Sequence, residues 1–255
     1  MLSANFINHW QNFLDPRKHV PSIRTFGVIN VLGPSLSLFI SHFWFITKMV
    51  FIVVAPFEIF KVLSLANPYD KLELRAQAFL LGRLCHLLIA PALIYALMKF
   101  MHTGVAPGVH ESYRWGLTRL GKLFVCAAIA YFLQALGYVF LIIPGIMIGL
   151  TLAVVYPIAV LEQRSVSDVL RRSSQLTRGY RFEILGAQLV MWLMTLMITI
   201  PLGLMSQNVS FWPLAVLAAI VEDVIQQASL VLTLVMYLSL LRTHQPSRPI
   251  VSLTP

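Results

Sequence analysis

The chain has few charged residues and only two cysteines. Asp, Glu, Lys and Arg together make up 11% of its 255 residues, whereas hydrophobic residues make up 58%. Soluble domains carry roughly 25% charged residues, so this composition excludes an ordinary soluble domain. Apolar runs long enough to cross a bilayer recur along the sequence, and we therefore expect an all-α, polytopic membrane protein.

The sequence also lacks the motifs that carry catalysis or bind metals. Cys85 and Cys126 each lie inside an apolar run, where cysteine behaves as a small hydrophobic residue. His102, His110 and Glu111 are close in sequence, but their spacing matches no compact ligand pattern. No glycine-rich phosphate loop and no nucleophile with a neighbouring base is legible. We therefore expect no enzyme activity, no cofactor and no metal.

Six apolar segments are predicted to cross the membrane as a helical bundle. We expect a cytoplasmic arm at 1–25, a membrane domain at 26–241 and a cytoplasmic tail at 242–255. An interfacial segment at 26–33 and an amphipathic piece at 112–122 should lie along the membrane surface. The predicted spans are 34–66, 76–101, 123–143, 146–161, 182–205 and one that ends at Leu241.

Pro144 and Gly145 separate the third predicted span from the fourth. Proline has no N–H and glycine tolerates left-handed backbone, so we expect this pair to form the turn of a membrane hairpin. The fourth span is short and contains Pro157.

Basic residues are distributed unequally between the predicted loops. The two that fall in the outer loops are Lys71 and Arg75. Cytoplasmic segments carry most of the others, which are Arg17, Lys18, Arg24, Lys99, Arg114, Arg119, Lys122, Arg164, Arg171, Arg172, Arg178, Arg181, Arg242 and Arg248. By the positive-inside rule, both termini should be cytoplasmic. The net charge of +9 is therefore a topology signal, and no isolated basic domain indicates nucleic acid.

A basic amphipathic helix is predicted between the fourth and fifth spans. Ser165 and Asp168 have the spacing of a capping box, and Gly179 follows where the helix should end. One face carries apolar residues at helical spacing, so we expect the helix to lie in the membrane interface. The basic residues of this segment, expected to meet anionic headgroups, are Arg164, Arg171, Arg172, Arg178 and Arg181.

Several spaced features of the last two thirds of the chain are similar to those of a known family. They are Pro144-Gly145, Pro157, Glu162, the run from Val169 to Gly179 and the end of the last span, Tyr237 to Arg242. The chain resembles the membrane domain associated with bacterial glycerophosphodiester phosphodiesterases and related stand-alone multi-span bacterial membrane proteins. The resemblance implies a bacterial inner-membrane protein. It implies no hydrolase activity, because no long non-membrane segment corresponds to the phosphodiesterase domain.

Charged residues inside the apolar runs are the usual indicators of function in a membrane protein. Glu58 and Arg83 lie at similar distances from the predicted outer turn, at ~10 to 12 Å depth from a rise of 1.5 Å per residue. We therefore expect them to pair across the first hairpin, in the outer half of the bilayer. The alternative is that Glu58 pairs with Lys61 on its own helix, while Arg83 extends outward to the membrane interface or meets Glu222.

Glu222 and Asp223 form a polar set with Gln226 and Gln227 in the last apolar run. The set could line an ion or proton path. The simpler interpretation is that the last span covers 224–241, which leaves the two carboxylates in its first turn, where acidic residues favour the helix dipole. His86 is isolated in apolar sequence, so we expect a hydrogen-bonded packing residue.

These patterns favour a non-enzymatic inner-membrane protein that binds lipid or acts as a scaffold for a membrane protein partner. Its expected contact surface is the basic helix, with anionic headgroups as partners. The alternative is a transporter of a small solute or lipid, because short spans interrupted by glycine and proline are typical of transporters. A transporter would require the polar set of the last span to face a cavity.

Overall fold

The computed structural model describes residues 26–65, 71–207 and 212–244, and every regular element in these ranges is an α-helix. The helices are α2 (Val28–Ser41), α3 (Phe43–Leu65), α4 (Lys71–Thr103), α5 (Val109–Phe140), α6 (Ile142–Thr151), α7 (Val155–Leu161), α8 (Val166–Thr177), α9 (Arg181–Gln207) and α10 (Trp212–His244). Most of the predicted arm and tail lies outside these ranges.

The predicted class is confirmed. Within the described ranges, six helical segments are long and apolar enough to cross a membrane, with α6 and α7 counted together as one. The fold is therefore an all-α polytopic bundle. It also contains the short apolar helix α2 and the polar helix α8.

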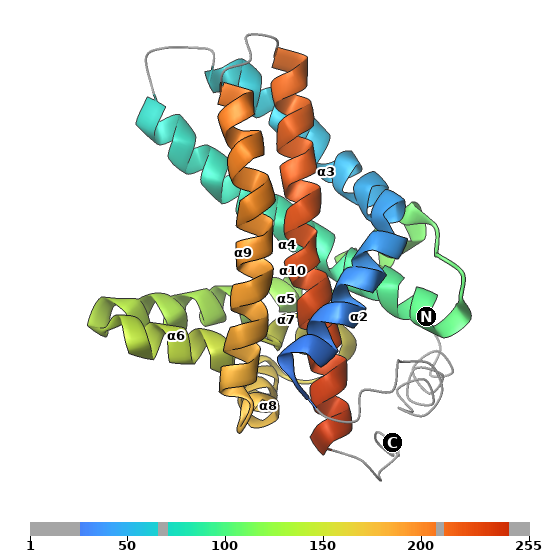
Figure 1. Ribbon diagram of the computed structural model, residues 1–255, viewed down its shortest axis with the longest axis vertical. Coiled ribbons are helices and arrows are strands. Elements are labelled where there is room, and N and C mark those ends of the chain that lie inside the picture. The colour runs from blue at the N-terminus through green and yellow to red at the C-terminus, as the bar shows by residue number, and fades with distance from the viewer. Residues whose placement is uncertain (1–25, 66–70, 208–211, 245–255) are drawn as a thin grey trace.

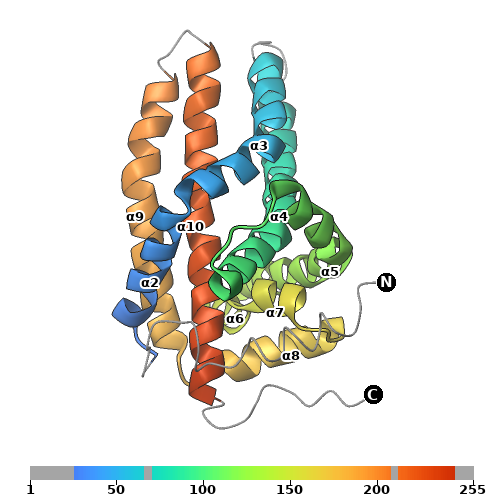
Figure 2. The same cartoon turned by 90° about the vertical axis from the view of Figure 1, so that its right-hand side faces the viewer.

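Two pairs of long helices run along the molecule (Figures 1 and 2). One pair is α9 with α10, and the other is α3 with α4. In each pair, the C-terminal end of the first helix lies near the N-terminal end of the second, at the top of both views. At the opposite end, the ring of Tyr180 contacts Phe26 and His244, with ring centroids 5.2 and 5.7 Å apart. The beginning of α2, the beginning of α9 and the end of α10 therefore lie on the same side as α8.

The α5–α6 hairpin lies crosswise to α9 and α10, which periodicity and length did not predict (Figures 1 and 2). Its first half packs on α4, where Gly116 allows a close approach: a Cβ atom there would lie 2.8 Å from the backbone nitrogen of Ala92. Nearby, the Tyr95 hydroxyl donates to Glu111 Oε1 at 2.7 Å, and Trp115 stacks on the Tyr95 ring. The contact with α4 therefore holds the base of the hairpin in place.

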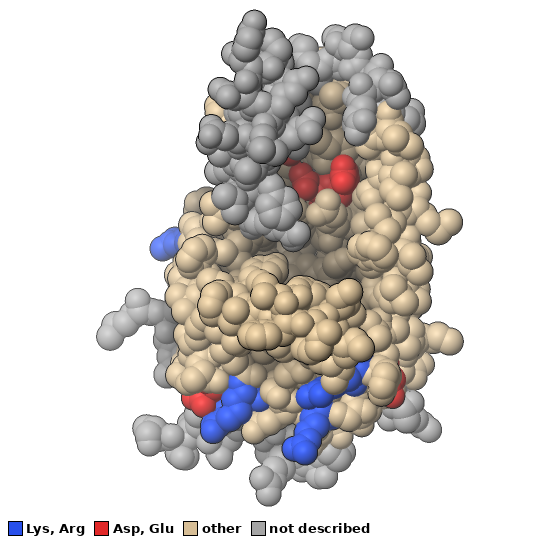
Figure 3. Space-filling model, turned by 90° about the vertical axis from the view of Figure 1, so that its left-hand side faces the viewer, with Lys and Arg blue, Asp and Glu red and all other residues tan. Residues whose placement is uncertain are grey.

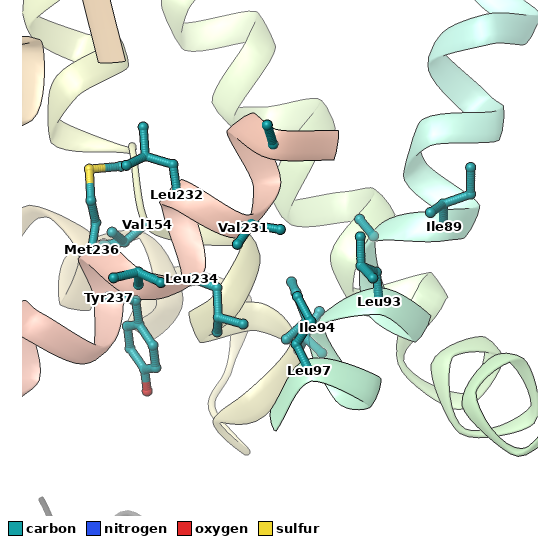
Figure 4. Close-up of a cluster of buried hydrophobic side chains, with 14 of the residues drawn as sticks. Ile89, Leu93, Ile94, Leu97, Val154, Val231, Leu232, Leu234, Met236 and Tyr237 are labelled. Atoms are coloured by element: carbon teal, nitrogen blue, oxygen red, sulfur yellow. The ribbon is translucent and has the colours of Figure 1, made fainter. Parts of the chain in front are cut away.

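The buried core lies where the lower half of α10 meets α4 (Figure 4). Figure 4 shows Ile89, Leu93, Ile94 and Leu97 of α4 near the α10 segment 231–237. In this segment nearly every side chain is buried, as expected for a helix surrounded by protein on all sides.

Three predicted boundaries were wrong. The first helix continues through Pro34, and the chain breaks at His42 instead, where both the backbone N–H and Nδ1 of His42 lie within hydrogen-bond distance of the Leu38 carbonyl oxygen, at 3.3 and 2.9 Å. The amphipathic piece at 112–122 is continuous with the third span in α5. The fourth span breaks into α6 and α7, and Pro157, which lacks an N–H, lies in the first turn of α7, where proline is favoured.

The predicted hairpin turn was also misplaced. The chain reverses at Leu141, which has extended backbone, and Pro144 and Gly145 lie in the first turn of α6. Proline is favoured there because the first N–H groups of a helix have no intrahelical partner. Gly145 serves helix packing: a Cβ atom built on Gly137 would lie 2.8 Å from the Cα of Gly145, so the two glycines let α5 and α6 touch.

Candidate functional site

A cavity of about 580 Å³ opens on the side of the molecule above the α5–α6 hairpin (Figure 3). Its floor comes from α5, α6 and α7, and its walls come from α4, α9 and α10. Figure 3 shows the recess from outside, with acidic side chains at its upper margin. Each of these helices is a long apolar segment or part of one, so the cavity lies among the helices that can cross a membrane.

A hydrogen-bonded cluster of three polar side chains connects α4 to α10 at the cavity. His86 Nε2 lies 3.2 Å from Asp223 Oδ1, and His86 Nδ1 lies 2.9 Å from Gln227 Nε2. Gln227 Nε2 also donates to the Asp223 carbonyl oxygen at 3.2 Å. With the proton of a neutral ring assigned to Nε2, His86 donates to the carboxylate and accepts from the amide. Both ring nitrogens are then satisfied, while the amide oxygen of Gln227 remains available as an acceptor.

Neutral polar groups line the rest of the cavity. The hydroxyl oxygens of Tyr131 and Tyr156 lie 3.1 Å apart on the floor. Gln134 lies on the same side, and the α9 wall contributes Thr195 and Thr199 between apolar residues. Hydroxyl and amide groups both donate and accept hydrogen bonds, so this lining can hold a polar group without requiring a charge.

No lysine or arginine is among the described residues that line the cavity, whereas Glu222 is one of them. A phosphate would meet carboxylate oxygens there, and like charges at close range repel strongly in a medium of low dielectric constant. A group that donates hydrogen bonds and carries no negative charge is complementary. The apolar and aromatic lining, which includes Trp192, suits an apolar part of the same molecule.

The structure corrects the interpretation of Glu222 and Asp223. They do not lie in the first turn of the last span, because α10 already begins at Trp212 and the apolar residues after it continue the helix. Both carboxylates therefore lie within the helix: Glu222 lines the cavity, and Asp223 contacts His86 beside it. The sequence did not indicate that His86 contacts Asp223, since the two residues are 137 positions apart and no local pattern links them.

The other two intramembrane charges are only partly described. The Glu58 side chain is buried, with 2% of its surface exposed. The side chains of Arg83 and Lys61 lie outside the described residues. The pair between Glu58 and Arg83 therefore stays a prediction.

The predicted basic helix is α8, and both of its end signals are confirmed. The Ser165 hydroxyl accepts from the backbone N–H of Asp168 at 3.3 Å and donates to Asp168 Oδ2 at 2.7 Å. Gly179, just after the helix, has a φ of +91°, a backbone conformation that glycine adopts without strain.

The apolar face of α8 packs against protein, which differs from the expectation of a face lying in lipid. Val169 and Leu176 are fully buried, and so are Ser173 and Thr177 on the same face. The hydroxyls of Ser173 and Thr177 donate to the carbonyl oxygen of Thr151 at 2.9 and 3.3 Å. These bonds satisfy a carbonyl at the end of α6, which would otherwise lack an intrahelical partner. The helix is amphipathic because its apolar face covers the protein core.

The five arginines of this segment divide into two groups. Arg164, Arg171 and Arg178 are exposed, and Arg172 and Arg181 are half-buried. Figure 3 shows basic side chains gathered along the lower edge of the molecule. Arg171 pairs with Asp168 at 3.0 Å. The outward group is positioned to meet a charged surface, while Arg172 faces the protein interior.

Glu162, just after α7, connects four helices at the inner side of α8. Its Oε1 accepts from the hydroxyl of the fully buried Tyr237 of α10 at 2.9 Å, and its Oε2 pairs with Arg164. Arg172 Nε of α8 lies 3.9 Å from Oε1, and Lys122 Nζ of α5 donates to the Glu162 carbonyl oxygen at 2.6 Å. One carboxylate thus compensates basic groups that would otherwise repel one another.

No family model matches the chain, and neither a curated protein nor a solved structure matches it.

Proposed function

We propose that this protein is a non-enzymatic membrane protein that binds a lipid or a similar amphipathic molecule in the lateral cavity. One observation carries the proposal. An open recess among apolar helices has apolar and aromatic walls, and the His86–Asp223–Gln227 cluster lies at the same recess. A site built this way gives hydrogen bonds to a polar end and contact to an apolar end. The polar end donates hydrogen bonds and is not a phosphate, because the Glu222 carboxylate lines the site and the Asp223 carboxylate lies beside it in the cluster.

The outer face of α8 supports a second contact, with anionic headgroups or a membrane protein partner. Arg171 and Arg178 are exposed there, and a cation near an anionic membrane surface gains about 1 kcal/mol. On the asymmetry of basic residues, we place α8 and both termini on the cytoplasmic side of a bacterial inner membrane. We also propose, from the sequence pattern alone, a relation to the membrane domain associated with glycerophosphodiester phosphodiesterases.

Blocking the cavity tests its role. Thr195 lines the cavity, so Thr195→Trp should fill part of it and lower the amount of co-purifying lipid at least about tenfold, which corresponds to about 1.4 kcal/mol. Met197, on the same helix, is 78% exposed, and Met197→Trp is the matched control that should retain the lipid. Mass spectrometry of lipids extracted from the purified protein gives the readout. Equal lipid content in both variants and in the native protein would place the bound lipid elsewhere.

Charge removal tests the surface of α8. The double change Arg171→Gln and Arg178→Gln should lower the ratio of anionic to zwitterionic lipid around the protein in mixed bilayers by up to about thirtyfold, because two cations of about 1 kcal/mol each are lost. The variant with lysine at both positions keeps the charge and is the control. High salt should weaken the native preference, since the attraction is screened over ~8 to 10 Å. A preference that survives in the glutamine variant argues against the arginines as the contact.

Transport of a small solute or lipid is the second candidate. It is favoured because Glu222, Gln226 and Gln227 of α10 face the cavity, which a transport path along this helix requires. Binding alone and transport are distinguished by proteoliposomes that contain the lipid found in the purified protein. Movement of this lipid between leaflets that Thr195→Trp abolishes would favour transport.

A further inference from the structure

By length and composition, α5 could cross a membrane and so could α6 together with α7, but the direction of the α5–α6 hairpin in the fold differs from that of a spanning hairpin. Both views draw it crosswise to α9 and α10, which are the longest straight pair (Figures 1 and 2). If α9 and α10 cross the bilayer along their length, a crosswise hairpin runs along the plane of the membrane instead of through it.

Both ends of the hairpin are fixed on the side of the molecule where α8 lies. At the end of α6, the Thr151 carbonyl accepts from Ser173 and Thr177 of α8. On α5, Lys122 donates to the Glu162 carbonyl oxygen just before α8. The hairpin therefore lies as a layer directly above the basic helix, and the cavity lies on its other face.

The tip of the hairpin is unsuited to water. The five residues from Val139 to Ile143 are between 67% and 81% exposed, and all five are large and apolar. From Val139 to Ile148 the sequence VFLIIPGIMI contains no side chain that can form a hydrogen bond. A turn at an aqueous membrane face commonly carries polar, basic or aromatic anchoring residues, as the interface favours them. Acyl chains are the surroundings that match this tip.

We infer that the α5–α6 hairpin is a re-entrant element: it lies within the membrane leaflet next to α8, with its tip among acyl chains, and does not cross the bilayer. The backbone of such an element is satisfied, because both arms are helical and each makes its own hydrogen bonds. The hairpin then closes the lateral cavity toward the α8 side. A lipid would therefore enter the cavity sideways, from the membrane.

The depth of Leu141 tests this inference in the full-length protein. Leu141→Cys, in a chain that also carries Cys85→Ala and Cys126→Ala, takes a nitroxide label without disturbing packing, because residue 141 is exposed. In bilayers, the label should be accessible to oxygen and protected from a water-soluble nickel complex, at a depth within the leaflet on the α8 side. Gln175→Cys on exposed α8 provides the aqueous reference for that side.

Three results would overturn the inference. Access to the nickel complex, together with labelling by an impermeant maleimide from the side opposite Gln175, means that the hairpin crosses the bilayer. The same access from the side of Gln175 means that the tip lies in water. Protection from both oxygen and nickel means that protein, such as a second copy of the chain, covers the tip. Ile143→Cys repeats the measurement two residues away and should give the same depth.

Discussion

Replacing Glu162 with alanine is expected to lower the free energy of unfolding by about 2 to 3 kcal/mol, at the upper end of the effect of single substitutions. The carboxylate accepts the hydroxyl of the fully buried Tyr237 and pairs with Arg164. Without it, the Tyr237 hydroxyl loses this acceptor in the protein interior. The basic groups of Arg164, Arg172 and Lys122 would then lie together without the negative charge that offsets their repulsion.

The measurement is thermal or denaturant unfolding of the purified protein in one detergent. Two neighbouring arginines give the matched comparison: Arg172, 18% exposed, faces Glu162, whereas Arg171 is 73% exposed and pairs with Asp168. Arg172→Ala should destabilise clearly, and Arg171→Ala should change stability by less than about 0.5 kcal/mol. If Glu162→Ala proves as harmless as Arg171→Ala, Glu162 does not hold these helices together.

A double change separates the two contributions of Glu162. Adding Tyr237→Phe to Glu162→Ala removes the hydroxyl that has lost its acceptor, so part of the stability should return relative to Glu162→Ala alone. The loss of stability that remains in the double variant measures the repulsion among the uncompensated basic groups. Glu162→Gln keeps an acceptor for Tyr237 without the charge, and it should fall between the native protein and the alanine variant.

Features that depend on local sequence were predicted correctly. Ser165, Asp168 and Gly179 act within one or two turns of α8, so their spacing alone indicates where the helix begins and ends. The number of long apolar helices follows in the same way, because length and hydrophobicity are local properties. The side of the membrane on which these ends lie depends on charge asymmetry and stays a prediction.

Features that depend on packing were predicted poorly. Glu222 and Asp223 interrupt the last apolar run, and the sequence therefore suggested that a helix begins there. In the structure α10 continues through both residues, and His86 of α4 contacts the carboxylate of Asp223. The direction of the α5–α6 hairpin could not be predicted either. Hydrophobic periodicity identifies a helix but does not say which neighbour it crosses. Close contacts at small residues bring the hairpin against its neighbours, and Gly116 is one of these residues, so we expect them to set that direction.

Gly116 and Gly121 of α5 should respond in opposite ways to the same substitution. A Cβ atom on Gly116 would lie 2.8 Å from the backbone nitrogen of Ala92 and 3.0 Å from its Cα, and backbone cannot move aside as a flexible side chain does. Gly116→Ala should therefore push α5 away from α4 and cost about 1 to 3 kcal/mol. A Cβ atom on Gly121 would meet nothing within 4 Å. Gly121→Ala should stabilise the protein by up to about 1 kcal/mol, because alanine is the better helix former.

The pair also tests whether the contact at Gly116 sets the direction of the hairpin. Both variants remove a glycine from the same helix, so a general effect of helix propensity would move them in the same direction. Because the base of the hairpin rests on α4 through Gly116, Gly116→Leu should displace the hairpin and lower lipid retention in the cavity above it. Gly121→Leu should leave retention unchanged. Stabilisation by Gly116→Ala similar to that by Gly121→Ala would show that the close approach is not needed. The direction of the hairpin would then have to come from its contacts with α8, where Ser173 and Thr177 bind the Thr151 carbonyl.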